Sequence, residues 1–419
     1  MRTLLSPLTL VVVVVLCDGC RAPEPRDASP TPEVDPMLSV NTLIAAPEDF
    51  AARRVGSDDY PVPSYAKSLE GVRICLDPGH GGDAHKRGYK RGPTGVREAE
   101  VNLRVARYLR AFLETAGAEV LLTREADLDL SLADRAAIAN DWDADLFISL
   151  HHNAIDNKPH VNYTTVWYHH DVDYRPANLD LARYLCYGLY DSIALPQTTD
   201  VPLKSDQLMY ESGFGVLRRA QVTAALVESS FFTTPEEEQR LRDPEYNLLE
   251  AHGLFIGLAK YAAAGLPKAF LIEPEDAVIA AQAVIPTSTS DPHVVPRSAS
   301  GIRVIPRSAS DEESGSVVEQ TISSERGPVR PTGLVFELDD GLRWRKAWGH
   351  ERQMILSDSI AVRIDGQHAP HGFSDDGERY LLIASLPDDL TPGEHHVEVQ
   401  FQNMNKNSVL NPHFVIDVR

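Results

Sequence analysis

The chain has 419 residues, of which 43% are hydrophobic and 24% are charged, so it is long and apolar enough for two folded domains. Acidic residues outnumber basic ones by 61 to 40, and the formal net charge of −21 argues against general binding to nucleic-acid phosphates. The acidic residues are spread along the chain, which indicates a solvated acidic surface on folded domains and does not favour any particular binding partner. Four cysteines are too few for a disulfide scaffold.

The N-terminus has the pattern of an export signal, which we assign to residues 1–20. Its apolar run is shorter than the roughly 20 residues that a membrane-spanning helix needs. The run ends in Cys17-Asp-Gly-Cys20, which resembles a bacterial lipoprotein cleavage box, although Cys17 and Asp18 depart from the usual pattern. We expect export to the periplasm or cell envelope. Two outcomes stay open: membrane attachment through a lipid on Cys20, or ordinary cleavage and release.

Composition also divides the rest of the chain. Residues 21–69 begin with many Pro, Ser and Asp residues and predict a tether and lead-in. Residues 271–335 contain no Phe, Tyr or Trp, so we predict a disordered linker over 269–330. This linker separates a first domain at 70–268 from a second at 331–419.

Strand-like runs alternate with helical ones in the first domain, and this order predicts a mostly parallel sheet with helices on both faces. The expected strands are 72–77, 119–123, 146–150, 164–168 and 223–228, and the expected helices are 98–116, 131–140, 177–192 and a stretch that ends at 262. After residue 331, short strand-like runs are separated by turn residues. They predict a small all-β sandwich, most simply an immunoglobulin-like one.

Several residues that could carry chemistry follow the expected strands, and active sites of open α/β sheets lie at the carboxyl ends of strands. These residues are His80, His151 or His152, and Glu228, while Glu98 opens the first long helix. Two His and two Glu at one edge fit a zinc hydrolase, in which three ligands hold the metal and a carboxylate accepts a proton from bound water. Neighbouring strand residues point to opposite faces, so at most one of the two adjacent histidines faces a metal. Taken singly, either of the adjacent histidines also fits a capping or surface role, Glu228 fits a surface charge at a strand end, and the glycine-rich loop at His80 fits a phosphate-binding loop, although it lacks the Walker spacing and lysine.

Six short motifs occur in a fixed order along the first domain. They are Asp77-Pro-Gly-His80-Gly-Gly, Glu98-Ala-Glu-Val-Asn102-Leu, Thr123-Arg124-x-x-Asp127, Leu132-x-x-Arg135, Phe147-Ile-Ser-Leu-His151 and Val227-Glu228. Over residues 70–264 the chain resembles the zinc-dependent N-acetylmuramoyl-L-alanine amidases of the third amidase type.

The resemblance implies a site and a reaction. His80, Glu98 and His151 would bind Zn²⁺, and Glu228 would be the catalytic carboxylate. The reaction would be hydrolysis of the amide between N-acetylmuramic acid and L-alanine in peptidoglycan, in cell-wall remodelling or septal cleavage. Asp77 would accept a hydrogen bond from a ligand imidazole, because metal sites commonly orient their histidines in this way.

The chain departs from the family pattern at Ala99, at Ser230 and Thr234, and in a basic loop at 83–91 that is expected to meet either stem-peptide carboxylates or solvent. Two other functions therefore stay open. The chain could be a non-catalytic peptidoglycan-binding protein on an amidase fold, or a scaffold whose C-terminal module binds the wall or a protein partner. We expect His169 and its neighbour His170 to lie on the surface.

Overall fold

The computed structural model describes residues 43–86, 89–195, 202–272, 302–305, 333–342, 354–375, 377 and 379–418. The export signal, Cys20, the start of the tether and most of the linker lie outside these residues. Residues Val40–Arg419 form one compact unit. Among the described residues, no helix is long and apolar enough to cross a membrane.

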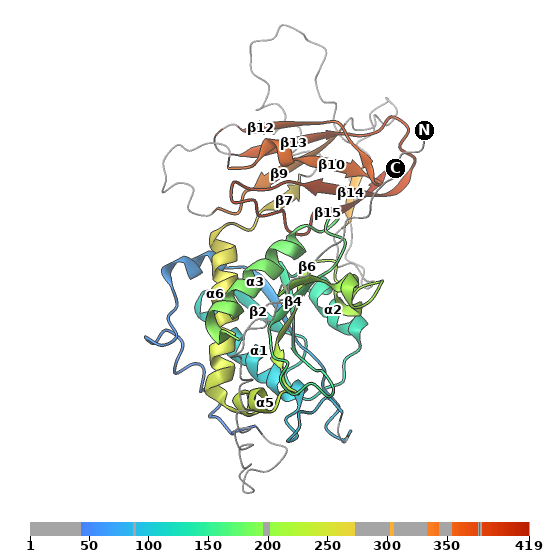
Figure 1. Cartoon of the computed structure of the whole chain (residues 1–419). Coiled ribbons are helices and arrows are strands. Elements are labelled where there is room, and N and C mark those ends of the chain that lie inside the picture. The colour runs from blue at the N-terminus through green and yellow to red at the C-terminus, as the bar shows by residue number, and fades with distance from the viewer. Residues whose placement is uncertain are drawn as a thin grey trace, which may run out of the picture. The chain divides into compact units, whose positions relative to one another are not determined.

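A six-stranded sheet forms the centre of the first domain (Figure 1). Its strands are β1 (Arg73–Pro78), β2 (Glu119–Leu122), β3 (Leu146–Asn153), β4 (Thr165–Tyr168), β5 (Leu203–Ser205) and β6 (Thr223–Phe231). Their order is β2-β1-β3-β6-β4-β5. The first four of these pair in parallel, whereas β4 runs antiparallel to β6 and parallel to β5. The predicted mostly parallel sheet is confirmed.

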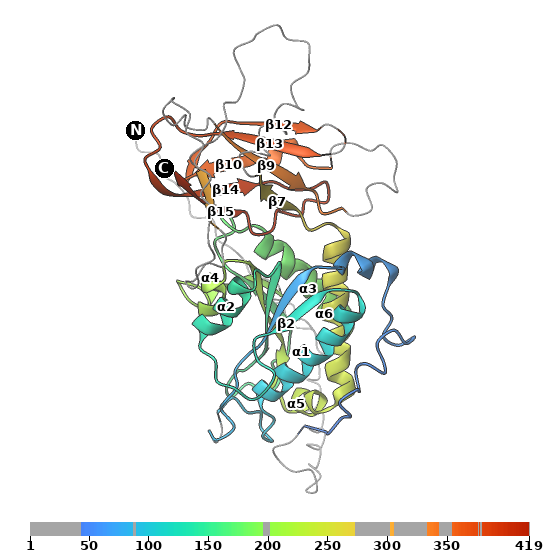
Figure 2. The same ribbon diagram turned by 180° about the vertical axis from the view of Figure 1, so that it is seen from behind.

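Helices cover both faces of this sheet (Figures 1 and 2). They are η1 (Ser64–Leu69), α1 (Glu98–Thr115), α2 (Leu132–Asp141), α3 (Ala177–Ile193), η2 (Asp206–Leu208), α4 (Gly215–Arg219), α5 (Pro235–Arg242) and α6 (Pro244–Ala263). Helices α1, α3 and α6 share the larger core with one face of the sheet, while α2 and α4 pack on the other face. The fourfold spacing of Val101, Val105 and Leu109 puts all three in the larger core, where each is fully buried.

The end of the segment predicted as tether and lead-in packs onto this domain. Phe50 and Tyr60 are both buried and belong to the larger core. The Phe50 ring stacks on Tyr108 of α1 at a centroid distance of 5.6 Å. Residues from about 50 onward are therefore part of the folded domain.

The C-terminal module is all-β, as predicted, and consists of two antiparallel sheets. Its strands are β7 (Lys268–Leu271), β8 (Ile302–Ile305), β9 (Gly333–Asp339), β10 (Ala361–Ile364), β11 (Gln367–His368), β12 (His371–Asp375), β13 (Tyr380–Ser385), β14 (Gly393–Gln400) and β15 (His413–Val418), with a short helix η4 (Ser357–Ser359). The sheet orders are β11-β10-β14-β15-β8 and β12-β13-β9-β7. Phe336 and Phe401 lie in the core between them.

Two of these strands come from the segment expected to be linker or from its edge. Strand β7 pairs with β9, and β8 pairs with β15. A strand at the edge of a sheet is held by backbone hydrogen bonds along one side, so it needs no aromatic residue of its own. Strand β8 contains no aromatic residue, so the composition did not reveal it, whereas β7 includes Phe270 and spans the boundary expected between residues 268 and 269.

Hydrogen bonds also join the module to the first domain within this unit. Asn411 Oδ1 lies 2.6 Å from the backbone nitrogen of Thr223, the first residue of β6. Asp180 of α3 accepts a hydrogen bond from the backbone of Ser408 at 2.9 Å. The bond at Thr223 lies at the amino end of β6, away from the carboxyl ends at which a site is expected.

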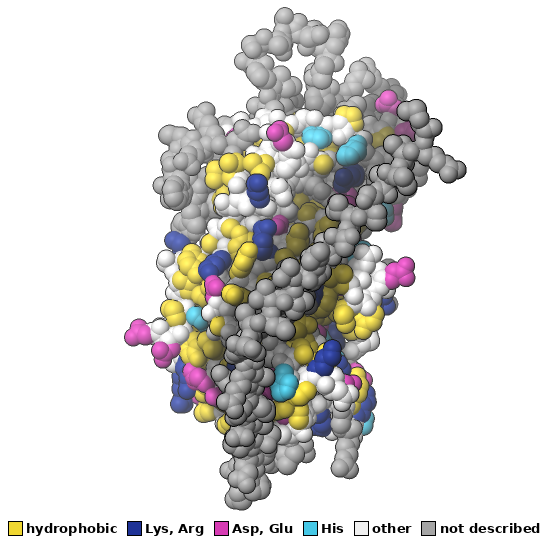
Figure 3. Space-filling model, viewed as in Figure 1, with side chains coloured by type: hydrophobic (Ala, Val, Ile, Leu, Met, Phe, Trp, Pro, Cys, Tyr) yellow, Lys and Arg dark blue, Asp and Glu magenta, His cyan; other side chains and the backbone are white. Residues whose placement is uncertain are grey.

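On the face shown in Figure 3, acidic and basic side chains are interspersed among hydrophobic and neutral ones.

Candidate active site

The loop after β1 carries His80 and is shaped by its neighbours. His80 has a φ of 58°, in the left-handed region, which turns the chain sharply. A Cβ at Gly79 would lie 2.1 Å from a ring carbon of His151, so only glycine fits there. Arg124 donates to the carbonyl of Gly79 at 2.9 Å, and Arg135 donates to the carbonyl of His80 at 2.8 Å. These two guanidinium groups hold the loop in place.

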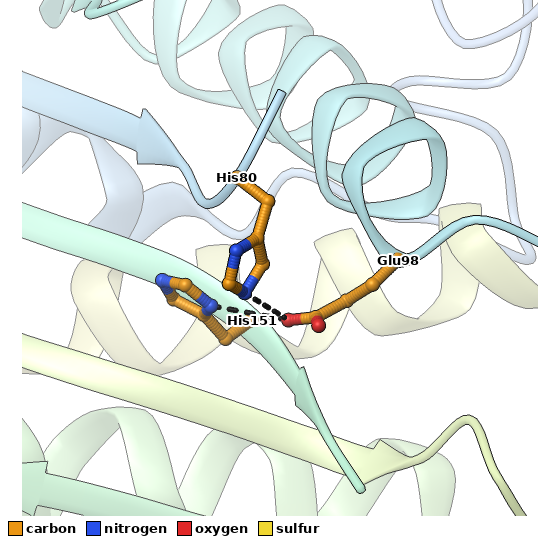
Figure 4. A group of neighbouring side chains, drawn as sticks. All are labelled: His80, Glu98 and His151. Atoms are coloured by element: carbon orange, nitrogen blue, oxygen red, sulfur yellow. Dashed lines mark hydrogen bonds and ion pairs between the residues drawn. The ribbon is translucent and has the colours of Figure 1, made fainter. Parts of the chain in front are cut away.

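Three side chains from separate elements point toward one another (Figure 4). His80 comes from the loop after β1, Glu98 opens α1, and His151 lies on β3. Glu98 Oε1 is 3.2 Å from His80 Nε2 and 3.1 Å from His151 Nδ1. A tetrahedral zinc ion with ligands at about 2.0–2.1 Å separates neighbouring donor atoms by about 3.3 Å, which these distances approach.

The protonation states of this group also suit metal binding. Burial would raise the pKa of Glu98, but His151 and His80 hold that pKa well below its ordinary value. Burial lowers the pKa of His151, which favours a neutral imidazole with a free lone pair. Glu98 Oε2 is buried and accepts no hydrogen bond from any residue that the structure describes. Two imidazoles and the Glu98 carboxylate are a donor set that fits a zinc ion.

Glu228 lies beside this group on β6, where it pairs in register with His151 of β3. Its Oε2 is buried and has no hydrogen-bond partner in the described part of the chain. Burial, followed by the charge of Glu98, raises the pKa of Glu228 well above its ordinary value, while Lys90 opposes this shift. Two neighbouring carboxylates whose pKa values are pushed apart are typical of a site in which one stays ionised and the other exchanges protons.

All four residues chosen from the sequence line one cavity of about 410 Å³. His152 projects away from the metal-ligand group, as strand alternation predicts: its Nδ1 lies 2.8 Å from Asn102 Oδ1 and its Nε2 lies 3.2 Å from Glu250 Oε2. Asn102 also donates to the carbonyl of Gly79. His152 therefore supports the loop that bears His80 indirectly, through its hydrogen bond with Asn102.

Asp77 has a different role from the one predicted. Its carboxylate accepts hydrogen bonds from Thr123 at 2.6 Å, Ser149 at 2.7 Å and Arg135 at 2.7 Å, and no described imidazole contacts it. Burial raises its pKa, but Arg135 and the two hydroxyl groups more than compensate and leave it below the ordinary value. Asp77 thus anchors Arg135, which in turn holds the loop that bears His80.

Two further residues of the site were not found from the sequence. Glu238 of α5 accepts hydrogen bonds from the backbone nitrogens of Thr94 and Val96, and so shapes the turn that precedes Glu98. Lys90 places its Nζ 3.9 Å from Glu98 Oε2. Glu238 stands in a run of three glutamates that reads as an exposed helix face, and Lys90 was one of several basic residues in a loop. Neither carried a distinguishing signal.

Comparison with known proteins identifies the domain. The Amidase_3 family model, described as N-acetylmuramoyl-L-alanine amidase, matches residues 74–258. A Staphylococcus aureus protein named "Probable cell wall amidase LytH" is 28% identical over 201 residues, which are 47% of this chain and 60% of that protein. The chain thus spans less than two thirds of that relative's length.

Two solved structures are similar over the same part of the chain. The N-acetylmuramoyl-L-alanine amidase AmiC2 of Nostoc punctiforme is 30% identical, with 46% of this chain and 98% of that chain covered and a TM-score of 0.40. An N-acetylmuramoyl-L-alanine amidase from Clostridium difficile 630 is 28% identical, with 46% and 97% covered and a TM-score of 0.41. Residues 74–258 are therefore an Amidase_3 domain, the domain of N-acetylmuramoyl-L-alanine amidases.

Proposed function

We propose that this chain is a zinc-dependent enzyme that hydrolyses the amide between N-acetylmuramic acid and L-alanine in peptidoglycan. The observation that carries the proposal is the convergence of His80, Glu98 and His151 on one point, in the cavity that Glu228 also lines with its buried Oε2 atom. The family assignment supplies the bond to be cleaved. His80, Glu98 and His151 are the proposed metal ligands, and Glu228 is the proposed catalytic residue.

The chain's own residues account for the proton transfers. A zinc ion bound by the three ligands would lower the pKa of a bound water and polarise the amide carbonyl. Glu228 accepts the proton of the attacking water at its unpartnered carboxylate oxygen and passes it to the departing nitrogen. Its raised pKa suits it to hold that proton between the two steps. The hydrogen bonds of Arg135 and Arg124 keep His80 aimed at the site throughout.

The cavity walls support a substrate with both charged and apolar parts. Lys86 and Lys90 line one part of the cavity, and Trp167, Met209 and Tyr210 line another. The lysines would meet the carboxylates of the stem peptide. The apolar residues would contact the faces of the sugar and the methyl groups of the peptide.

The setting of the enzyme follows from the proposed substrate. Peptidoglycan lies in the cell envelope, which agrees with the export signal expected at residues 1–20 and with either fate of Cys20. The C-terminal module would then bind the wall or a protein partner. The acidic chain is not expected to bind nucleic acid.

Digestion of purified sacculi tests the proposal. Mass spectrometry is expected to detect free stem peptides that begin with L-alanine, together with glycan strands bearing an intact lactyl group. A chelator should stop their release, and added Zn²⁺ should restore it. Binding of the chain to sacculi without such products, with or without Zn²⁺, would instead support the non-catalytic alternative.

A further inference from the structure

A second group of metal-ligating side chains lies where β4 ends. His169 and His170 follow β4, and Asp206 opens η2. The two histidines were expected on the surface, yet His169 has a side chain only 6% exposed, and that of Asp206 is fully buried. The His170 side chain is 32% exposed. The loop that follows η2 covers His169, and strand periodicity alone could not reveal this.

These three side chains converge on one another. Asp206 Oδ2 is 2.7 Å from His169 Nδ1, and Asp206 Oδ1 is 3.4 Å from His170 Nδ1. One donor atom from each residue lies within 4.8 Å of the others, as is also true of the first group, His80, Glu98 and His151. The two imidazole rings stand 4.3 Å apart at 60°.

The backbone around Asp206 fixes its carboxylate. The backbone nitrogens of His170 and Phe214 donate to its two oxygens at 3.1 and 2.8 Å. Gly213 has a φ of 68°, and a Cβ there would lie 2.3 Å from Asp206 Oδ2. The chain thus approaches the carboxylate more closely than any residue with a side chain would allow. The carboxylate is therefore held in position by the backbone alone, without the contribution of either imidazole.

We propose that His169, His170 and Asp206 bind a second divalent transition-metal ion of the zinc class. Two imidazoles and one carboxylate favour such an ion over Mg²⁺ or Ca²⁺, which prefer oxygen ligands. The two distances from an imidazole Nδ1 to an oxygen of Asp206, 2.7 and 3.4 Å, lie on either side of the roughly 3.3 Å edge of a tetrahedral zinc site. The partly exposed His170 leaves one side open for a water molecule as the remaining ligand.

The second ion would hold one wall of the active-site cavity. The loop between Asp206 and Phe214 carries Met209 and Tyr210, which line the cavity with Phe214. Phe214 packs edge-on against Trp167 of β4 at 5.5 Å and against Tyr210 at 5.6 Å. An ion that joins the end of β4 to this loop would fix these side chains. This role in substrate binding rests on the proposed amidase function, whereas metal binding itself does not.

Zinc stoichiometry of the full chain tests the second site. After equilibration with Zn²⁺ in excess and removal of free metal, the wild type is expected to hold two ions and His170→Gln one. His368→Gln changes an exposed histidine of β11 and should still hold two. Equal zinc content in the wild type and in His170→Gln would overturn the proposal.

A second measurement isolates this site from the first. His80→Gln removes a ligand of the first group, so Co²⁺ added to that variant should give the visible absorption of a cobalt–imidazole site. The double variant His80→Gln/His170→Gln should give none. A His80→Gln chain without cobalt absorption would overturn the proposal, whatever its activity. With peptidoglycan fragments, His170→Gln should raise KM by a larger factor than it lowers kcat.

Discussion

Replacing Arg135 by alanine removes one guanidinium group that both neutralises a buried carboxylate and holds the loop that bears His80, a proposed metal ligand. Arg135 Nη1 lies 2.7 Å from Asp77 Oδ1, and the side chains of both residues are at most 4% exposed. Nη1 also donates to the backbone carbonyl of Pro78, while Nε and Nη2 donate to the carbonyls of Leu130 and His80. The substitution therefore leaves Asp77 with only two hydroxyl partners and releases the His80 loop.

The expected cost follows from this burial. Removing one partner of a buried ion pair costs about 3–5 kcal/mol, because the other charge is left uncompensated. For a domain of about 200 residues, each kcal/mol lowers Tm by about 2–4 °C, so we expect a drop of about 6–20 °C. The loosened His80 loop should also weaken zinc binding by about 10- to 100-fold.

Thermal unfolding of the metal-free chain, followed by circular dichroism, measures the first effect, and zinc titration measures the second. Arg110→Ala is the matched control, because Arg110 pairs with Glu125 in a bond whose side chains are 29% and 66% exposed. An exposed pair contributes at most about 1 kcal/mol. Equal losses of Tm for Arg135→Ala and Arg110→Ala would refute the assigned role of Arg135.

Two further predictions concern the site and the C-terminal module. Gly79→Ala places a Cβ against the His151 ring and should reduce zinc affinity and sacculus hydrolysis together; unchanged affinity in a zinc titration would contradict this packing. In the module, the Asp365 hydrogen bond raises the pKa of His395, so the contribution of His395 to stability is present below about pH 6.5 and declines as pH rises through its folded pKa. Slight burial would raise the pKa of Asp365, but the hydrogen bond with His395 lowers it below the ordinary value. The contribution of Asp365 to stability is therefore present above about pH 3.9 and declines as the pH falls through its folded pKa. Asp365→Asn should therefore lower the Tm of the module more at pH 5.5 than at pH 8.5, and an equal drop at both would exclude the charge pairing.

Much of the site could be predicted because the determining pattern is local. A strand places alternate residues on opposite faces, so the side chains of His151 and His152 must point apart wherever the strand lies in the fold. Parallel strands bring their carboxyl ends to one edge, which explains how His80 and Glu228 meet although they are far apart in the chain. The motif order led to Glu98, which lines the same cavity as His80 and His151.

The remaining features depend on contacts between distant segments. Asp77 was expected to accept a hydrogen bond from an imidazole, but it accepts one from Arg135 of α2 instead. His169 was expected in solvent, but the loop after Asp206 covers it. The edge strand β8 is held through the backbone of β15, a kind of pairing that leaves little trace in side-chain composition.

The most direct test of the proposed mechanism is to measure hydrolysis and bound zinc in the same samples of Glu228→Gln. Glu228 is the proposed proton acceptor and not a metal ligand, so zinc content should equal that of the wild type. Release of stem peptides from sacculi should fall by at least about 10²-fold. Glu114→Gln, at an exposed position of α1, should match the wild type in both respects. Full hydrolysis by Glu228→Gln with its zinc in place would contradict the mechanism.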